Sequence, residues 1–171
     1  MRSERVTLRR LRAADLTALQ AYRNDPEVGR YQGWEPISDA AAAAMIAGMA
    51  AAPCPTPGDW VQIAIADAVN DGLLGDIGLH VSAAGDEAEL GITLARYAQG
   101  QGLAAAAAGA LIGMLREHTR VRRLIGITDV RNTASARLLE RLGMTLEAEE
   151  ETIFRGEPCR EARYALALRP A

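Results

Sequence analysis

One stretch in the second half of the chain constrains the fold more than any other. The alternating run Glu89 to Leu94 predicts a strand, the segment Gln99 to Ala104 contains two glycines, and the alanine-rich run Ala104 to Leu115 predicts a helix. The start of a helix presents free backbone N–H groups and the positive end of the helix dipole. Glycines let an anion approach that backbone closely. The stretch therefore predicts a strand–turn–helix unit that can hold a diphosphate group.

The residues of this loop distinguish between several phosphate-binding patterns. The nucleoside-triphosphate loop requires Gly-Lys-Ser/Thr, and no lysine follows Gly102. The dinucleotide fingerprint accepts Ala104 as its third small residue and Asp129 as its distant acid, but it belongs after the first strand of a βαβ unit. A dinucleotide-binding module therefore stays open as a weaker alternative. The simplest alternative is a tight strand-to-helix turn with no ligand.

The hydrophobic pattern of the whole chain predicts a mixed α/β (α+β) sheet of about seven strands flanked by about four helices. The length of 171 residues suits one domain, 1–171. The predicted strands are Arg5 to Leu11, Trp60 to Asp67, Leu73 to Val81, Ala88 to Leu94, Arg122 or Arg123 to Asp129, Met144 to Glu149 and Glu161 to Leu168. The predicted helices are Asp15 to about Asn24, Ala40 to Ala52, Ala104 to Leu115, and the one that Asn132 caps and Gly143 ends. Val28 to Pro36 is predicted to be irregular, and Phe154 to Pro158 to turn between the last two strands.

Composition argues against several classes of function. The formal net charge of −3 gives no general attraction to nucleic acid. No apolar run has the length of a membrane span, and the charged start of the chain does not resemble a signal peptide, so we expect a cytoplasmic protein. No cluster of His, Cys and carboxylate residues has the spacing of metal ligands, so we expect no metal.

The loop and three further segments resemble one family. The pattern Gln99-x-x-Gly102-x-Ala104 resembles the acyl-CoA loop of the GNAT superfamily of N-acetyltransferases, Gln/Arg-x-x-Gly-x-Gly/Ala. The segment from Asn132-Thr133-Ala134-Ser135 to Leu142-Gly143-Met144 is similar to the family's Asn-x-x-Ser…Leu-Gly-Phe segment. Arg30 to Trp34 and Gly75 to Leu79 are similar to segments of its ribosomal-protein N-terminal acetyltransferase branch, the RimJ/RimL-like proteins.

The resemblance implies acetyl-CoA as co-substrate and a strand around Gly91 that bulges and splays from its neighbour, leaving room for the pantetheine arm. The backbone at Ile92 and Leu94 would pair with that arm, Asn132 would hydrogen-bond it, and Arg96 or Arg137 would assist at the phosphates. The residues whose backbone N–H groups would hold the diphosphate are Gln99, Gly100, Gln101, Gly102, Leu103 and Ala104.

The implied reaction is direct attack of a primary amine on the thioester, with a backbone N–H near Ile92 to Leu94 stabilising the oxyanion. Glu89 has the best strand position for the base, directly or through water, although a strand glutamate is often only exposed. Ser135 is predicted to face inward with the leucines of its helix, and either bonds back to that helix or contacts the cofactor sulfur. Many family members place a tyrosine where this chain has Leu139, so Ser135 is left to act as acid or only to hydrogen-bond the leaving sulfur.

The sequence does not identify the acceptor amine. Tyr31 and Trp34 share one loop and are predicted either to line a substrate pocket or to plug one end of the core. The acidic residues Glu147 to Glu151 are predicted to be a solvated edge, with attraction of a cationic amine as the alternative. Resemblance to the RimJ/RimL-like branch implies a protein N-terminus as acceptor, while the fold also serves small-molecule amines. A non-catalytic acyl-CoA-binding sensor remains an alternative function. The resemblance to the family also suggests a homodimer.

Overall fold

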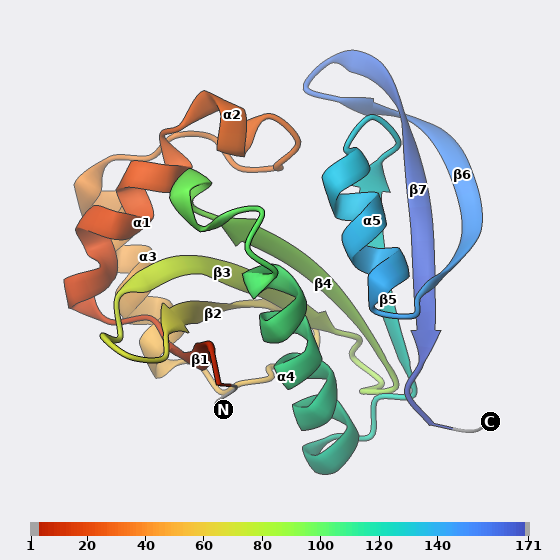
Figure 1. The fold of residues 1–171 in the computed structure, drawn as a ribbon, viewed down its shortest axis with the longest axis horizontal. Coiled ribbons are helices and arrows are strands. Elements are labelled where there is room, and N and C mark those ends of the chain that lie inside the picture. The colour runs from red at the N-terminus through yellow and green to blue at the C-terminus, as the bar shows by residue number, and fades with distance from the viewer. Residues whose placement is uncertain (1–3, 170–171) are drawn as a thin grey trace.

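A computed structural model describes residues 4–169 and contains the predicted seven-stranded mixed sheet (Figure 1). The strands are β1 (Val6–Arg10), β2 (Trp60–Asp67), β3 (Leu73–Val81), β4 (Glu87–Leu94), β5 (Arg123–Asp129), β6 (Thr145–Phe154) and β7 (Glu157–Ala167). Their order across the sheet is β1-β2-β3-β4-β5-β7-β6. The pairing of β4 with β5 is parallel and the other pairings are antiparallel, as expected for two strands joined by a crossover helix.

Helices cover both faces of the sheet, but unequally (Figure 1). The helices are α1 (Leu16–Arg23), α2 (Pro26–Gly29), α3 (Asp39–Ala51), α4 (Leu103–His118) and α5 (Thr133–Arg141). On one face α4 packs on the first half of the sheet and α5 on β5. On the other face α1 and α3 pack on β2 and β3. No helix within residues 4–169 is long and apolar enough to cross a membrane.

The larger hydrophobic cluster lies between α4 and the sheet. Ala107, Leu111 and Leu115 of α4 are completely buried. The alanines give this helix a high propensity and a slim face, which lets it lie close to the strands. The sheet side of the cluster consists of Val6, Leu8, Val61, Ile63, Ile65, Ile77, Leu79 and Leu90. Alternation along β2 thus sends its large side chains to α4, as predicted, and leaves Ala64 for the face that α1 and α3 cover.

Two local predictions were wrong. Pro26 to Gly29 forms the short helix α2, because Pro26 occupies its first turn and the Asp25 side chain caps it. The last two strands are longer than predicted, because a turn of only two residues, Arg155-Gly156, joins β6 to β7. Both residues have positive φ, 53° and 81°, the conformation that such hairpin turns require. The acidic stretch Glu147 to Glu151 therefore lies within β6, the exposed edge strand.

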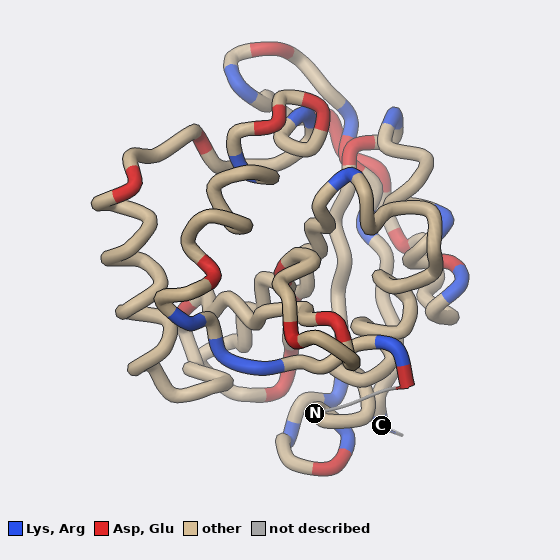
Figure 2. Tube along the Cα trace, turned by 60° about the vertical axis from the view of Figure 1, so that its left-hand side comes forward, with Lys and Arg blue, Asp and Glu red and all other residues tan. Residues whose placement is uncertain are grey.

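Charged residues are spread over the molecule rather than gathered by sign. Positively and negatively charged positions are both scattered along the Cα trace of the described residues (Figure 2). Several of these charges form ion pairs, including Arg123 with Glu87 and Glu147, and Arg160 with Glu149. The charges therefore define no single face for a large partner.

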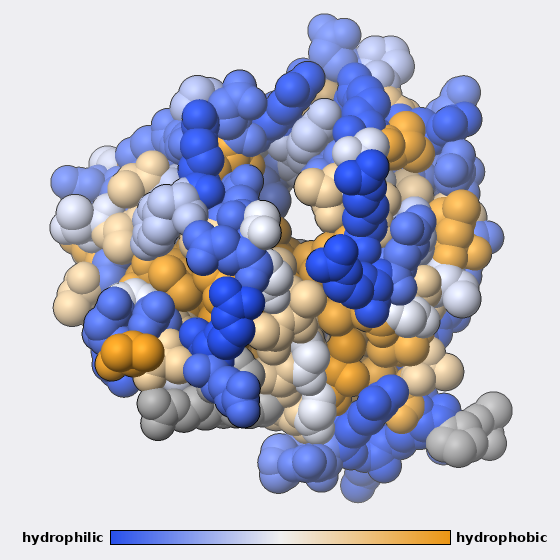
Figure 3. Space-filling model, in the orientation of Figure 1, coloured by the Kyte–Doolittle hydropathy of each residue, from blue (hydrophilic) through white to orange (hydrophobic). Residues whose placement is uncertain are grey.

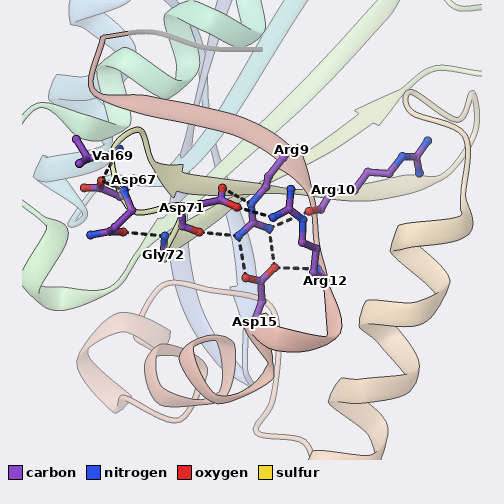
Figure 4. Close-up of polar contacts among 9 residues, drawn as sticks. Arg9, Arg10, Arg12, Asp15, Asp67, Val69, Asp71 and Gly72 are labelled. Carbon is purple, nitrogen blue, oxygen red and sulfur yellow. Dashed lines mark hydrogen bonds and ion pairs between the residues drawn. The ribbon is translucent and has the colours of Figure 1, made fainter.

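A buried ion pair joins β1 to the segment that precedes α1 (Figure 4). The guanidinium of Arg9 donates to both carboxylate oxygens of Asp15, at 2.7 and 2.9 Å, and the two side chains are only 9% and 7% exposed. Arg9 also donates to Asp71 in the β2–β3 turn at 2.9 Å, and Arg12 pairs with the same carboxylate. Burial alone would raise the pKa of Asp15, but the hydrogen bonds from Arg9 and from the Arg12 N–H hold it below its ordinary value.

We predict that Asp15→Ala lowers the free energy of unfolding by about 3 to 5 kcal/mol, because it leaves the Arg9 charge buried without its main partner. The measurement is urea unfolding at pH 7. Asp71→Asn is the matched control: this carboxylate is 48% exposed, and asparagine accepts the φ of 62°, so the expected loss is much smaller than that of Asp15→Ala. Equal losses in the two variants would contradict the assignment.

The same pair gives a pH dependence with a defined sign. Because the folded-state pKa of Asp15 is lowered, its stabilisation is fully present above the ordinary pKa of an aspartate, about 4. The stabilisation is lost as the pH falls from there through the lowered folded-state value. Unfolding curves of the wild type and Asp15→Ala should therefore differ most at neutral pH and converge in acid.

Candidate functional site

The sheet is interrupted between β4 and β5. These strands pair only at Glu87, Ala88 and Glu89, opposite Arg123, Leu124 and Ile125, and the remainder of β4 has no neighbour on this side. The predicted splay is therefore present. The predicted bulge is not, because β3 and β4 pair in unbroken register from Gly75↔Leu94 to Val81↔Ala88. Gly75 permits this close pairing, since a Cβ there would collide with the Thr93 carbonyl oxygen.

The hydrogen bonds of the residues that flank β4 show to which side each N–H and C=O group of this strand points. The Asp86 carbonyl accepts from β5, at Arg122 and Arg123, whereas the N–H of Ala95 donates to Leu74 of β3. Successive residues of a strand point their backbone groups to opposite sides. The N–H and C=O groups of Leu90 and Ile92 therefore point into the gap beside β4, together with the C=O of Leu94, which accepts from the Gln99 side chain at 3.0 Å.

A pocket of about 600 Å³ fills this gap. Figure 3 shows it as an opening that passes through the molecule between the two halves of the sheet. Residues 90–94 form one wall, Ile127 to Asp129 of β5 form the opposite wall, and the starts of α4 and α5 meet it on one face. Its volume lies within the usual range for small-molecule sites.

The glycine loop has the predicted conformation and position. Gly100 and Gly102 have φ of 71° and 76°, and Gly102 is the N-cap of α4. The first helical hydrogen bond runs from Ala106 to the Gly102 carbonyl, so the N–H groups of the first turn have no partner within the helix. The loop residues that line the pocket are Gln99, Gly100, Gly102, Leu103 and Ala104. Gln101 does not; its side chain donates to the Tyr97 carbonyl at 2.7 Å.

The start of α5 faces the pocket from the other side. The Asn132 side-chain oxygen accepts from the Ser135 N–H at 3.2 Å and caps the helix, and Asn132 also lines the pocket. Ser135 is half-buried and lines the pocket next to Leu138 and Leu139, as predicted. Within residues 4–169 its hydroxyl makes no hydrogen bond, so the alternative of a bond back to its own helix was wrong.

The two arginines considered for the phosphates differ in position. Arg137 lines the pocket, as does Arg141 one turn later in α5. Arg96 does not: it forms a two-pronged ion pair with Asp25, at 2.8 and 3.1 Å. Arg5, which the sequence did not suggest, donates to the Gln101 carbonyl at 2.6 Å and places a cation beside the glycine loop.

The two loop aromatics differ in position. Tyr31 lines the pocket. Trp34 instead packs on the core, where its ring lies 4.4 Å from the guanidinium carbon of Arg23. Arg23 in turn donates to Asp76 of β3 at 2.8 Å, a pair that is almost completely buried. Trp34 therefore does not reach the site as a substrate-binding residue; it anchors the loop that presents Tyr31.

Glu89 lies at the edge of the pocket rather than in its lining. It is the last residue of β4 to pair with β5, and Leu90 and Gly91 directly after it line the pocket. Burial raises the pKa of Glu89, while His80 and Arg163 lower it and Glu161 and Glu87 raise it further. A carboxylate with a raised pKa at the rim of a pocket suits a general base.

Sequence reasoning missed several lining residues. Glu27 of α2, Gln32, Phe154 and Glu161 also line the pocket. Arg155, at the tip of the β6–β7 hairpin, donates to the carbonyls of Gln32 and Trp34 at 3.2 and 2.8 Å. This contact joins the hairpin to the loop after α2, and both views show the two segments side by side (Figures 1 and 2). No local pattern marks these residues, because their contacts span more than 100 residues of sequence.

Comparison with known proteins decides the family. A family model described as an acetyltransferase (GNAT) domain matches residues 5–145, most of the chain. The chain belongs to the GNAT acetyltransferase family. Its domain is that of an acyltransferase, and the mixed sheet described above is the GNAT fold. No curated protein matches the chain in sequence.

Solved structures of GNAT proteins superimpose on nearly the whole chain. An acetyltransferase of the GNAT family from Bacillus anthracis is 20% identical, with a TM-score of 0.87 and coverage of 98% of both chains. Spermidine N-acetyltransferase from Vibrio cholerae, in complex with CoA and spermine, is 20% identical with a TM-score of 0.81, over 97% of both chains. RimL, a ribosomal L7/L12 alpha-N-protein acetyltransferase in complex with CoA, is 20% identical with a TM-score of 0.84, over 96% of this chain and 95% of that one. At these identities the likeness establishes the fold of the GNAT protein described here.

We predict that Glu89→Gln raises the free energy of unfolding at pH 8. A raised folded-state pKa means that the charged carboxylate is disfavoured in the folded protein. The contribution of Glu89 to the free energy of unfolding is therefore most favourable below the ordinary pKa of a glutamate, and it decreases as the pH rises through the folded-state value. Removing the charge should therefore stabilise the protein at pH 8 and have a smaller effect at pH 4, where the carboxyl is largely protonated in both states. Urea unfolding at the two pH values measures the difference, and a variant that is less stable at pH 8 would contradict it.

Proposed function

We propose that this GNAT protein transfers an acetyl group from acetyl-CoA to a primary amine, and that residues 1–171 form one N-acetyltransferase domain. The observation that carries the proposal is the gap between β4 and β5, which opens onto the glycine loop at the start of α4. Two sets of unpaired backbone groups meet there: the first-turn N–H groups of α4 and the groups of Leu90 and Ile92 in β4. Such groups need partners, and an acyl-CoA supplies both an anion and an amide-containing arm.

The cofactor arrangement follows from these two sets. The N–H groups from Gly100 to Ala104 hold the diphosphate. Gln99, which the sequence analysis included among these donors, gives its N–H to the Arg96 carbonyl at 3.2 Å. Gln101 contributes only its backbone, because its side chain is bonded within the loop. Arg137 supplies positive charge from the facing helix. The pantetheine amides pair with the backbone of Ile92 and Leu94 and with the free amide nitrogen of Asn132. No part of this arrangement needs a metal ion.

The reaction takes place where the pocket crosses the sheet. The N–H of Ile92 points into the gap and stabilises the negative charge that develops on the thioester oxygen. Glu89 receives the amine proton, directly or through water. Ser135 faces the same space with a free hydroxyl and hydrogen-bonds the departing sulfur. Glu161 lines the pocket itself, as Glu27 and Asp129 do, and it is the competing base.

The acceptor is an amine at a protein N-terminus or on a small molecule. The resemblance of Arg30 to Trp34 and of Gly75 to Leu79 to RimJ/RimL-like proteins favours the first, and structural likeness extends to RimL. It extends equally to spermidine N-acetyltransferase, so the small amine stays the second candidate. Tyr31, Glu27, Gln32 and Phe154 are the residues that would contact the acceptor.

We predict that the protein binds acetyl-CoA in titration calorimetry, does not bind NAD, and releases free CoA thiol in the presence of one acceptor class. The panel contains peptides with free N-termini and small mono- and polyamines. Ser135→Ala should lower kcat, because the leaving sulfur loses its hydrogen bond, and Glu89→Gln should lower it more than Glu161→Gln does.

Each failure in this experiment has a separate meaning. Acetyl-CoA binding with no thiol release from any amine would favour the non-catalytic acyl-CoA sensor. Absence of binding at millimolar acetyl-CoA would contradict the proposed function as a whole. Full turnover by Ser135→Ala at saturating acetyl-CoA would remove this residue from the mechanism.

A matched glycine pair tests the loop. We predict that Gly102→Ala weakens acetyl-CoA binding by about tenfold or more, because a left-handed conformation costs an alanine roughly 1 to 2 kcal/mol and the loop relaxes away from it. Gly85→Ala is the control: Gly85 has φ of 75° against 76° for Gly102, but it lies in the β3–β4 turn away from the pocket. Both variants should lose similar stability in urea, and only Gly102→Ala should lose affinity in calorimetry.

A further inference from the structure

The proposed reaction releases a proton that must leave the site. An aliphatic or N-terminal amine is largely protonated at neutral pH. Its ammonium and the thioester become an amide, a free thiol and one proton, with the C–S bond broken and the C–N bond formed. One of the two protons that nitrogen loses goes to the departing sulfur, and the other goes to solvent in every turnover. The base therefore needs a route by which it returns to its charged form.

The position of Glu89 restricts that route. Its side chain lies on the face of the sheet opposite α4, because its neighbours Ala88 and Leu90 point into the α4 cluster. Its direct partner across the β3–β4 pair is His80. Opposed residues of an antiparallel pair share a face, with Cβ atoms about 4.5 to 5.5 Å apart. The imidazole is therefore the nearest side chain of β3 to the carboxylate.

The other charged groups near Glu89 either form ion pairs with Glu87 or are themselves carboxylates. Arg163 of β7 forms an ion pair with Glu87 at 3.5 Å, and Arg123 of β5 lies 3.7 Å from the same glutamate. Glu161 of β7 is itself a carboxylate. Within residues 4–169 Glu89 has no ion-pair partner of its own. Of these groups, the imidazole can accept a proton at one ring nitrogen and release one from the other.

His80 also connects Glu89 to solvent. It is half-buried, and within residues 4–169 its ring makes no hydrogen bond that would hold one nitrogen. On its other side it packs on Trp60, with ring centroids 5.4 Å apart and planes inclined by 38°. Trp60 is 45% exposed and contributes no titratable group. His80 thus lies between Glu89 on one neighbouring strand and the partly exposed Trp60 on the other.

We propose that His80 is a proton-relay residue, which takes from Glu89 the proton that the acceptor amine gives up and releases it to solvent beside Trp60. The proposal rests on the proposed function and deepens its chemistry. The proton passes from ammonium to carboxylate, then to an imidazole nitrogen, then to water, so both residues end each turnover in their starting forms. His80 acts through Glu89 and does not itself touch the acceptor.

The first test needs no turnover. The chain has two histidines, and His118 lies at the end of α4, so His118→Gln leaves His80 as the source of the only imidazole NMR signals. In that background, Glu89→Gln should change the pH titration curve of the imidazole. Glu151→Gln on the edge strand β6 should leave it unchanged. A curve that Glu89→Gln does not alter would overturn the proposal.

The second test separates a relay from a structural role. His80→Ala should lower kcat at neutral pH at least about tenfold and change the shape of its pH profile, with KM for acetyl-CoA unchanged. Free imidazole in the buffer should restore a large part of kcat in His80→Ala and leave the wild type unaffected. His118→Ala is the matched control, with wild-type kcat. His80→Gln, which keeps a polar side chain of similar reach on Trp60, should fold as the wild type and show the same defect.

The outcomes distinguish failure of the proton-relay proposal from failure of the proposed acetyltransferase function. A wild type that turns over while His80→Ala and His80→Gln are equally fast overturns the relay alone. A loss of kcat without rescue by imidazole, or with a matching loss of acetyl-CoA affinity, indicates a structural role and also overturns it. A wild type that binds acetyl-CoA but acetylates no amine overturns the proposed function, and the relay with it.

Discussion

The organisation of this protein depends on the loss of pairing between β4 and β5 after Glu89. Three paired positions keep the sheet continuous, and beyond them the backbone of β4 faces open space. A buried or half-buried strand edge is costly unless its N–H and C=O groups find partners. The pocket, the exposed groups of Leu90 and Ile92, and the approach of the glycine loop all follow from that single interruption.

The interruption also separates the chemistry by face. On the α4 and α5 face, the free N–H groups of the α4 start and the side chains of Asn132 and Ser135 converge on the gap. On the opposite face lie Glu89 of β4 and His80 of β3, which pair across the two strands. In the proposed reaction, the anionic cofactor and the amine that loses a proton would thus contact groups on opposite faces of the sheet. Gly91 keeps the passage between them clear, because the space that a side chain would occupy at this position has no atom within 4 Å.

Contacts outside the sheet compensate for the weak junction. The Arg9–Asp15 pair and the Arg23–Asp76 pair hold the first half together from β1 to β3, each by a charge that burial makes costly to leave unpaired. Arg155 then joins the β6–β7 hairpin to the loop after α2, across the mouth of the pocket. The two halves are therefore linked at both ends of the gap, by the three β4–β5 pairs at one end and by Arg155 at the other.

The sequence by itself predicted the seven strands, the four longer helices and the glycine turn before α4, because those depend on local rules. Alternation marked the seven strands, positive-φ glycines marked the turn before α4, and Asn132 marked the cap of α5. The tertiary structure alone decided the absence of a bulge in β4, the use of Arg96 by Asp25, and the packing of Trp34 on Arg23. Only the tertiary structure placed Glu89 opposite His80 and brought Glu27, Phe154 and Glu161 together in the lining of the pocket. These are contacts between residues far apart in the chain, and strand register and packing, which no local pattern encodes, bring them together.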